Sequence, residues 1–198
     1  MKFTPFLLLS FALLFAACET FTPTPKPRTY PRVLYPEKQY QTFRTSYCNF
    51  SFEQPTYAEV ERDTLFFDEK PSSDCWFNLN VPQLNAKIYC SYYPIKNRAD
   101  FDKLVSDAFF IANKHTIKAS YIDPIPVHRD ADHVHGLIFD LDGPAASMYQ
   151  FFLTDSTKHF LRGALYFNTQ TRRDSLEEVI NFMKPDLDRI VNTLQWEQ

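Results

Sequence analysis

The order in which strand and helix patterns follow one another constrains the fold of this chain more than any other feature. Strand patterns come first, a helical repeat follows, further strand patterns come next, and a second helical repeat ends the chain. Short turns, rather than helices, join most neighbouring strand patterns, which favours hairpins over βαβ units. The sequence therefore predicts an α+β fold, with a mainly antiparallel sheet and two main helices packed on it.

Hydrophobic period and turn signals place the individual elements. Apolar residues recur at helical spacing over residues 101–112, after a cap at Asn97, and again over residues 176–194. Pro185 lies inside the second repeat and lacks a backbone N–H, so we expect a kink or a break near Lys184. The predicted strands span residues 45–53, 74–80, 86–93, 119–125, 133–141, 148–154 and 159–167.

Glycine is scarce in this sequence. Only 3 of the 198 residues are glycine, where average usage would give about 14. Loops that cradle phosphates need several glycines close together, because the backbone must approach the anion. Gly136, Gly143 and Gly163 are too far apart for a P-loop or a dinucleotide-binding fingerprint, which excludes both. Gly163 falls inside a strand pattern, which predicts a bulge or the close approach of another backbone.

The N-terminal segment has the features of a secretory leader. Lys2 precedes an apolar run over residues 6–15, and two alanines stand directly before Cys18. This arrangement resembles the lipobox of bacterial lipoproteins, in which the cysteine is acylated and becomes the first residue of the mature chain. An ordinary cleaved signal with an incidental cysteine is the alternative. We predict a lipoprotein signal peptide over residues 1–17 and membrane anchoring through a lipid on Cys18.

A proline-rich stretch separates the leader from the rest of the chain. Four prolines between residues 23 and 31 prevent helix and disfavour sheet. Residues 18–41 are therefore predicted to form an extended spacer, and residues 42–198 a single globular domain. No acid-rich cluster follows Cys18, which favours a lipid-anchored domain of the cell envelope that faces the periplasm. Whether the inner or the outer membrane holds the lipid stays open.

The net charge of the chain limits the kinds of molecule that it is expected to bind. The formal net charge is −3, from 21 basic and 24 acidic residues. Proteins that bind nucleic acid usually carry a basic excess, because they neutralise phosphates. The sequence therefore predicts no nucleic-acid partner, and no motif in it predicts a cofactor.

Three cysteines remain beyond Cys18. An oxidising periplasm favours one disulfide and leaves one thiol unpaired. Cys48 and Cys75 each lie at the end of a strand pattern, a position from which two cysteines can face each other. We therefore predict a Cys48–Cys75 disulfide. Cys90 lies among residues that suggest a small buried side chain.

Two clusters contain residue types that metal binding or catalysis needs. Residues 128–135 include three histidines and two aspartates, and His133 and His135 would share one face of a strand. A third ligand would have to curl back, so a solvated turn is the simpler interpretation. Residues 155–159 include an Asp, a Ser and a His, but they lie too close together on one hairpin tip to align as a triad. We predict no catalytic residues and no metal site.

Several short motifs occur in the order and spacing of one known family. They are Tyr35-Pro-Glu-Lys, Cys48 followed by Phe52-Glu-x-Pro55, Cys75-Trp-Phe-Asn78, Ala86-Lys-Ile-Tyr89, His115-x-x-Lys118-Ala119, the run from Gln150 to Phe167, and Thr193-Leu-Gln-Trp196. Together with the lipobox and the proline-rich start, they resemble a GldD-type gliding-motility lipoprotein of the Bacteroidota. The order of the elements also resembles the Mog1/PsbP-like sandwich.

The resemblance to the GldD family implies a non-enzymatic component of the cell envelope, needed for gliding and tied to the type IX secretion machinery. It implies two kinds of partner, the membrane and other proteins of that machinery, and it supplies no catalytic residues. We take the predicted hairpin at residues 154–167 as the candidate contact surface, with Lys158, His159 and Arg162 as its polar members. A purely structural hairpin is the alternative.

Two further hypotheses stay open. The first is a periplasmic lipoprotein that binds a small molecule or a glycan through aromatic side chains. A solvent-facing aromatic cleft in the size range of ligand pockets would favour it. The second is an envelope hydrolase, which would need a metal or nucleophile site that the sequence does not assemble.

Overall fold

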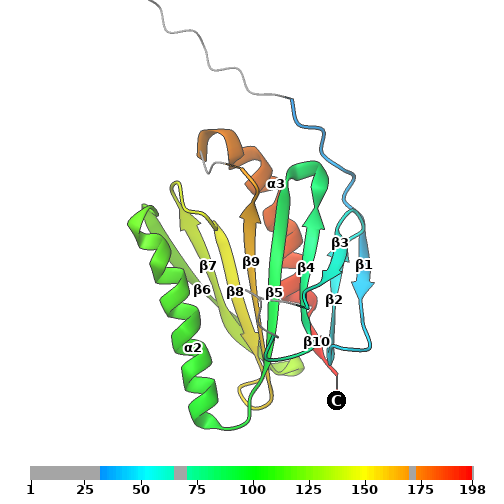
Figure 1. The fold of residues 1–198 in the computed structure, drawn as a ribbon, viewed down its shortest axis with the longest axis vertical. Coiled ribbons are helices and arrows are strands. Elements are labelled where there is room, and N and C mark those ends of the chain that lie inside the picture. Colours follow the sequence, from blue (N-terminus) through cyan, green and yellow to red (C-terminus); the bar gives the residue numbers. More distant parts are fainter. Residues whose placement is uncertain (1–31, 65–70, 170–172, 198) are drawn as a thin grey trace, which may run out of the picture. The chain divides into compact units, whose positions relative to one another are not determined.

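In the computed structural model, which describes residues 32–64, 71–169 and 173–197, a seven-stranded sheet is the centre of the fold (Figure 1). All neighbouring strands in this sheet run antiparallel. Its strands, in spatial order, are β3 (Glu59–Arg62), β4 (Trp76–Val81), β5 (Ala86–Pro94), β9 (His159–Phe167), β8 (Tyr149–Thr154), β7 (Val134–Asp142) and β6 (Tyr121–Arg129).

A smaller sheet and two α-helices complete the described part of the chain. Helix α2 (Arg98–Asn113) continues into the 3-10 helix η2 (Lys114–Ile117) and carries the chain from β5, inside the sheet, to β6 at its edge. Helix α3 (Arg173–Thr193) follows β9. None of the described helices is both long and apolar enough to cross a membrane. The strands of the smaller sheet, in spatial order, are β1 (Tyr40–Phe43), β2 (Phe50–Pro55) and β10 (Gln195–Trp196).

Two hairpins of the large sheet use the same type of turn. The 3-10 helix η1 (Pro82–Leu84) joins β4 to β5, and η3 (Asp130–Asp132) joins β6 to β7. Each is followed by one residue in the left-handed conformation, Asn85 at φ 48° and His133 at φ 52°. Asn is tolerated there more readily than most residues, because its short side chain bonds locally.

The two faces of the large sheet pack against different helices. Along β8, Phe151 and Leu153 belong to the larger core, which includes the apolar side of α3. Phe152 lies between them in sequence and belongs to a smaller core with α2. Successive side chains of a strand alternate between faces, which produces this division. The small sheet also packs on the α3 side, where Phe43 stacks on Phe77 with ring centroids 4.5 Å apart.

The cysteines are paired as the sequence predicts. Cys48, in the loop before β2, forms a disulfide with Cys75 at the start of β4. A crosslink that closes a loop of this size stabilises a protein by about 3–4 kcal/mol on the chain-entropy model. Cys90 on β5 is a buried free thiol, and burial raises its pKa. The thiol therefore lacks the thiolate character that a reactive cysteine needs.

The α+β prediction is confirmed, but the first predicted strand is wrong in position. Residues 45–49 turn so that Cys48 reaches Cys75, and β2 spans Phe50–Pro55. Strands β1, β3 and β10 are not among those that the sequence predicts. These strands are short, and all four residues of β3 are exposed, so no alternation of apolar and polar residues marks it. Strand β1 begins at Tyr40, slightly ahead of the predicted start of the domain at residue 42.

Pro185 does not break the last helix. Helix α3 continues through it without interruption from Arg173 to Thr193. Met183 and Leu187 on either side of the proline are fully buried against the sheet. Their burial contributes roughly 1.5–3 kcal/mol each, which offsets the lost backbone hydrogen bond.

Gly163 lies in an uninterrupted strand. It pairs with Cys90 on β5 and with Phe151 on β8, so the predicted bulge is absent. A Cβ atom on Gly163 would lie 2.2 Å from Cζ of Phe151. An aromatic ring, rather than another backbone, therefore occupies the space above this glycine.

We expect Gly163→Ala to lower the free energy of unfolding by about 1–3 kcal/mol, the usual effect of overpacking a core. Urea unfolding followed by circular dichroism measures it. Since the added methyl group meets the ring, Phe151→Leu should make Gly163→Ala less destabilising than it is in the parent chain. A Gly163→Ala protein as stable as the parent would contradict this account of the glycine.

Candidate functional site

A buried carboxylate joins the beginning of the domain to its last helix. Asp186 on α3 is fully buried. Its Oδ1 lies 2.7 Å from the Nζ of Lys38 and accepts a hydrogen bond from the Tyr40 hydroxyl at 2.8 Å, and Tyr57 donates to Oδ2. A buried charge is tolerated only where it is paired and hydrogen-bonded, and Asp186 has three such partners.

The tyrosine hydroxyls that contact Asp186 remain protonated. Burial, followed by the hydrogen bond to Asp186, raises the pKa of Tyr40 to about 12. The same two causes raise the pKa of Tyr57. Both hydroxyls therefore donate to the carboxylate over the whole physiological pH range.

Aromatic contacts reinforce this junction. Tyr35 stacks on Phe182 of α3 with ring centroids 4.6 Å apart. The Lys38 ammonium lies 3.9 Å from the centre of the same ring and also donates to the Phe182 carbonyl oxygen. Residues 35–38 are the Tyr-Pro-Glu-Lys motif noted in the sequence, so the structure gives this motif a positioning role. It sets the point on α3 at which the chain enters the domain.

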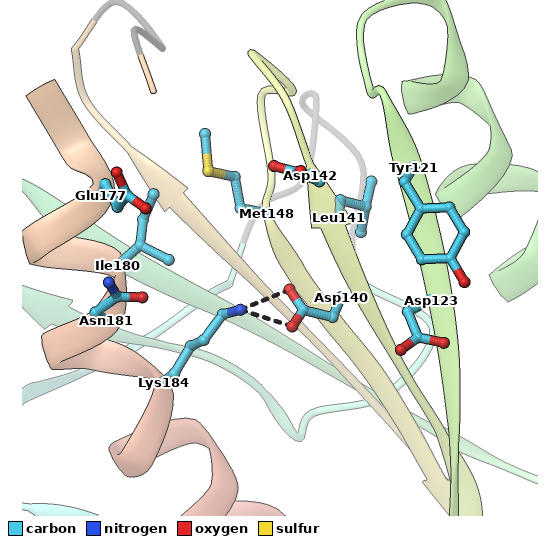
Figure 2. A pocket seen from close by; sticks show the side chains of 10 residues that line it. All are labelled: Tyr121, Asp123, Asp140, Leu141, Asp142, Met148, Glu177, Ile180, Asn181 and Lys184. Atoms are coloured by element: carbon cyan, nitrogen blue, oxygen red, sulfur yellow. Dashed lines mark hydrogen bonds and ion pairs between the residues drawn. The ribbon is translucent and has the colours of Figure 1, made fainter. Parts of the chain in front are cut away.

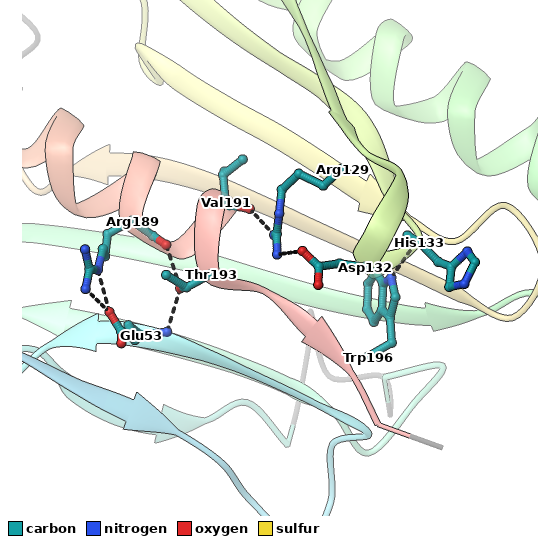
Figure 3. A network of polar contacts seen from close by, with 8 residues as sticks. All are labelled: Glu53, Arg129, Asp132, His133, Arg189, Val191, Thr193 and Trp196. Atoms are coloured by element: carbon teal, nitrogen blue, oxygen red, sulfur yellow. Dashed lines mark hydrogen bonds and ion pairs between the residues drawn. The ribbon is translucent and has the colours of Figure 1, made fainter.

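The C-terminal end of α3 is held by a second polar network (Figure 3). The Thr193 hydroxyl accepts the N–H of Glu53 at 2.8 Å, and Arg189 pairs with the Glu53 carboxylate. Arg129 donates to the carbonyl oxygen of Val191 at 3.0 Å. These contacts connect β2, β6 and α3.

The histidine and aspartate cluster at residues 128–135 takes part in the same network. His133 is the left-handed residue after η3, so it does not share a strand face with His135. Its carbonyl oxygen accepts the indole N–H of Trp196 at 3.1 Å, and Asp132 pairs with Arg129. Within the described residues, no group of three or more His, Cys, Asp or Glu side chains is placed to hold a metal ion.

The tip of the β8–β9 hairpin is organised by Asp155. Its Oδ1 accepts the backbone N–H groups of Thr157, Lys158 and His159 at 2.9, 2.8 and 2.8 Å. Ser156 adopts a positive φ of 64°. Asp155 and Ser156 therefore serve the turn, as the sequence predicts, and neither is aligned with His159 for catalysis.

The three residues of the predicted contact surface do not lie together. His159 is half-buried on the α3 side, where its Nδ1 lies 2.7 Å from the Tyr92 hydroxyl and its ring stacks on Trp196. Lys158 is exposed at the tip. Arg162 lies on the opposite face of the sheet, the α2 side, where it lines a cleft. Side chains alternate between the two faces of a strand, so the sequence itself indicates that residues 159 and 162, three positions apart, lie on opposite faces.

A cavity of about 800 Å³ crosses β4, β5 and β9 on the α2 side of the sheet. The packing of α2 in the smaller core explains why this cavity is open to solvent. Helix α2 packs over Phe139 and Phe152 of β7 and β8, at one end of the sheet (Figure 1), and leaves part of the other end uncovered. The aromatic and cationic residues that line the cleft are Trp76, Tyr89, Tyr93, Tyr166, Phe167, Lys87 and Arg162.

A smaller pocket of about 260 Å³ lies between α3 and strands β6 and β7 (Figure 2). Asp123, Asp140 and Glu177 make its lining acidic. Lys184 reaches across from α3 and places its Nζ 2.8 and 2.6 Å from the two carboxylate oxygens of Asp140. The ion pair fastens the helix to β7.

Neither Asp186 nor the cleft is among the sites that the sequence predicts. A signal for Asp186 exists, because the acidic residue stands inside the apolar stripe that contains Met183, Leu187 and Ile190. A charged side chain at such a position is buried with partners. No comparable signal exists for the cleft, which depends on where α2 packs.

Comparison with known proteins defines the family. The solution structure of cyanobacterial PsbP (CyanoP) from Synechocystis sp. PCC 6803 aligns with a TM-score of 0.46 and 10% sequence identity, over 81% of this chain and 94% of that one. No curated protein matches the sequence. The family model of gliding motility lipoprotein GldD matches residues 20–196. The chain therefore belongs to the GldD family of gliding-motility lipoproteins.

We expect Lys38→Met to lower the free energy of unfolding by about 2–3 kcal/mol. Removing one partner of a fully buried ion pair costs about 3–5 kcal/mol, and Lys38 is partly exposed, at 30% of its side chain. Urea unfolding provides the measurement. The matched control is Lys103→Met on the exposed face of α2, which should change stability by less than about 0.5 kcal/mol. Equal effects of the two substitutions would contradict the proposed role of Lys38.

We also expect the domain to lose stability in mild acid. Burial lowers the pKa of His159 in the folded protein, more than Asp155 raises it. The unfolded chain then binds the proton more readily, so stability falls as pH drops below about 6.5 and stops falling below the folded-state pKa. His159→Gln should reduce the difference in melting temperature between pH 7.5 and pH 5. His115, whose pKa burial also lowers, should account for part of what remains. An unchanged difference would show that His159 does not contribute.

Proposed function

We propose that this protein acts as a non-enzymatic accessory or assembly lipoprotein of the gliding-motility and type IX secretion machinery. It is held to the membrane by a lipid on Cys18, faces the periplasm, and works through contacts with other proteins of the machinery. The observation that carries this proposal is the match to the GldD family over residues 20–196. The predicted signal peptide, Cys18 and the proline-rich stretch as far as residue 31 lie outside the described residues.

The rigidity expected of the domain supports a scaffolding role. Neighbouring strands are antiparallel throughout the large sheet, a disulfide ties β4 to the loop before β2, and Asp186 ties the first strands to α3. These connections join parts of the chain that are far apart in sequence, so they oppose local opening of the domain. A stiff domain on an extended spacer is suited to presenting a surface at a distance from the membrane.

The surface supports contact with proteins. Phe110 on α2 is 59% exposed, and Ile117 in η2 is 88% exposed. Large apolar side chains that face water in this way are typical of interfaces, where a partner removes them from solvent. The exposed Lys158 at the tip of the β8–β9 hairpin is a second candidate contact site, and it is polar.

In vivo photo-crosslinking tests the contact function. A crosslinking amino acid at Phe110 or Lys158 should capture proteins of the gliding and secretion machinery, whereas the same amino acid at Thr42, exposed on β1, serves as the matched control. Cys18→Ser should release the protein from the membrane fraction, abolish these crosslinks and reduce gliding. A chain that crosslinks to no other protein from any position would contradict the proposal.

A second candidate function is a periplasmic lipoprotein that binds a small molecule or a glycan. The cleft of about 800 Å³ favours it, because it is the aromatic, solvent-facing cavity that such a function requires. The two functions are compatible, since Phe110 and Lys158 do not line the cleft.

A further inference from the structure

Arg162 is one of the residues that line the cleft on the α2 side of the sheet. It stands in the middle of β9, paired in register with Ser91 on β5 and Phe152 on β8. The Arg162 side chain is half-buried and lines the cleft. Its surroundings are therefore set by the walls of the cleft.

No described residue forms a hydrogen bond or an ion pair with the Arg162 side chain. Its electrostatic neighbours are Tyr93, Tyr166 and Asp107, which act at longer range, and burial lowers the pKa of the guanidinium against their influence. A guanidinium group has five N–H donors, and none of those of Arg162 meets an acceptor among the described residues, so they are free to bind a ligand that enters the cleft. The fold therefore retains a cation that nothing else in the described structure uses.

The second cation of the cleft is already paired. Lys87 lies 3.2 Å from the carboxylate of Glu61 on β3 and 5.5 Å from the centre of the Tyr89 ring. The cleft therefore offers one free planar cation instead of a group of positive charges. A single arginine fork matches a carboxylate, which it can bind through two parallel hydrogen bonds. A phosphate site usually gathers several cations or a row of backbone N–H groups.

The walls of the cleft indicate what is attached to that carboxylate. Tyr89 and Tyr166 stand edge to face, with centroids 5.5 Å apart and an interplanar angle of 85°, so their ring faces point in different directions. Tyr89 is 44% exposed. Asn78, Ser91 and Asn168 add amide and hydroxyl groups to the same lining. Aromatic faces beside hydrogen-bonding groups suit a ring with one apolar face and a rim of hydroxyl groups.

We propose that the cleft binds an acidic sugar, a uronic acid or a short chain of them, with its carboxylate on Arg162 and its ring against Tyr89. The volume of the cleft lies within the range of ordinary small-molecule sites. This inference deepens the second candidate function and rests on it. It is independent of the contact function, which the crosslinks at Phe110 and Lys158 test.

Calorimetric titration of the full-length protein in detergent tests the proposal. The probes are digalacturonate, neutral galactobiose, a tripeptide with a free C-terminal carboxylate, and inorganic phosphate. Digalacturonate should bind saturably and at least tenfold more tightly than the other three. Tighter binding of the tripeptide or phosphate would overturn the assignment to a sugar, equal binding of galactobiose would overturn the role of the carboxylate, and no binding of any probe would overturn the site.

Two substitutions test which residues of the cleft bind the sugar. Arg162→Met should weaken digalacturonate binding at least tenfold while the protein keeps or gains thermal stability, because the substitution removes a half-buried charge that has no partner among the described residues. Tyr89→Ala should also weaken binding, and it leaves the fold intact because Tyr89 is 44% exposed. The matched control is Arg98→Met, an exposed arginine at the start of α2. A stable Arg162→Met or Tyr89→Ala protein that binds as the parent does would overturn the proposal.

Crosslinking separates failure of this site from failure of the contact function. Arg162→Met cells should retain the crosslinks from Phe110 and Lys158, since neither residue lines the cleft. Loss of digalacturonate binding with the crosslinks intact supports both functions as separate properties. Loss of the crosslinks in this variant would overturn the independence of the cleft.

Discussion

The carboxylate of Asp186 is the interaction on which the rest of the structure depends. A charge with no solvent exposure is stable only while its partners stay in place. Those partners, Lys38, Tyr40 and Tyr57, come from the start of the domain, whereas Asp186 is in the last helix. The pairing therefore holds the small sheet, α3 and the chain entry together, and Tyr35 stacked on Phe182 extends the junction to the residues before β1.

Helix α3 is fastened to the large sheet at several further points. Lys184 pairs with Asp140 on β7, and the Tyr149 hydroxyl on β8 donates to Asp188 at 2.6 Å. Burial, followed by that hydrogen bond, raises the pKa of Tyr149, so it remains a donor. Helix α2 makes no comparable set of charged contacts with the sheet among the described residues, and its fully buried side chains are the small ones of Ala108 and Ala112. The α3 face is therefore a closed core, whereas the α2 face is open enough to hold a cleft.

This asymmetry connects the fold to its proposed roles. The closed face gives the domain the rigidity that a contact protein on a spacer needs. The open face keeps Arg162 in the lining of an aromatic cleft, where a half-buried cation without a protein partner contributes nothing favourable to stability. Stability and ligand binding frequently make opposite demands on the same residue. Arg162 is the described position where that conflict is clearest.

The sequence by itself determined the class of fold, because apolar residues repeat with period two in strands and 3.6 in helices, independently of what they pack against. It also determined the exclusion of glycine-rich phosphate loops and the pairing of Cys48 with Cys75. Only the tertiary structure decided which distant residues meet Asp186, and that α2 covers part of one sheet face and leaves the Arg162 cleft open. The period of the apolar residues indicates which face of a helix or strand is buried. Which other element covers that face depends on the packing of the whole chain.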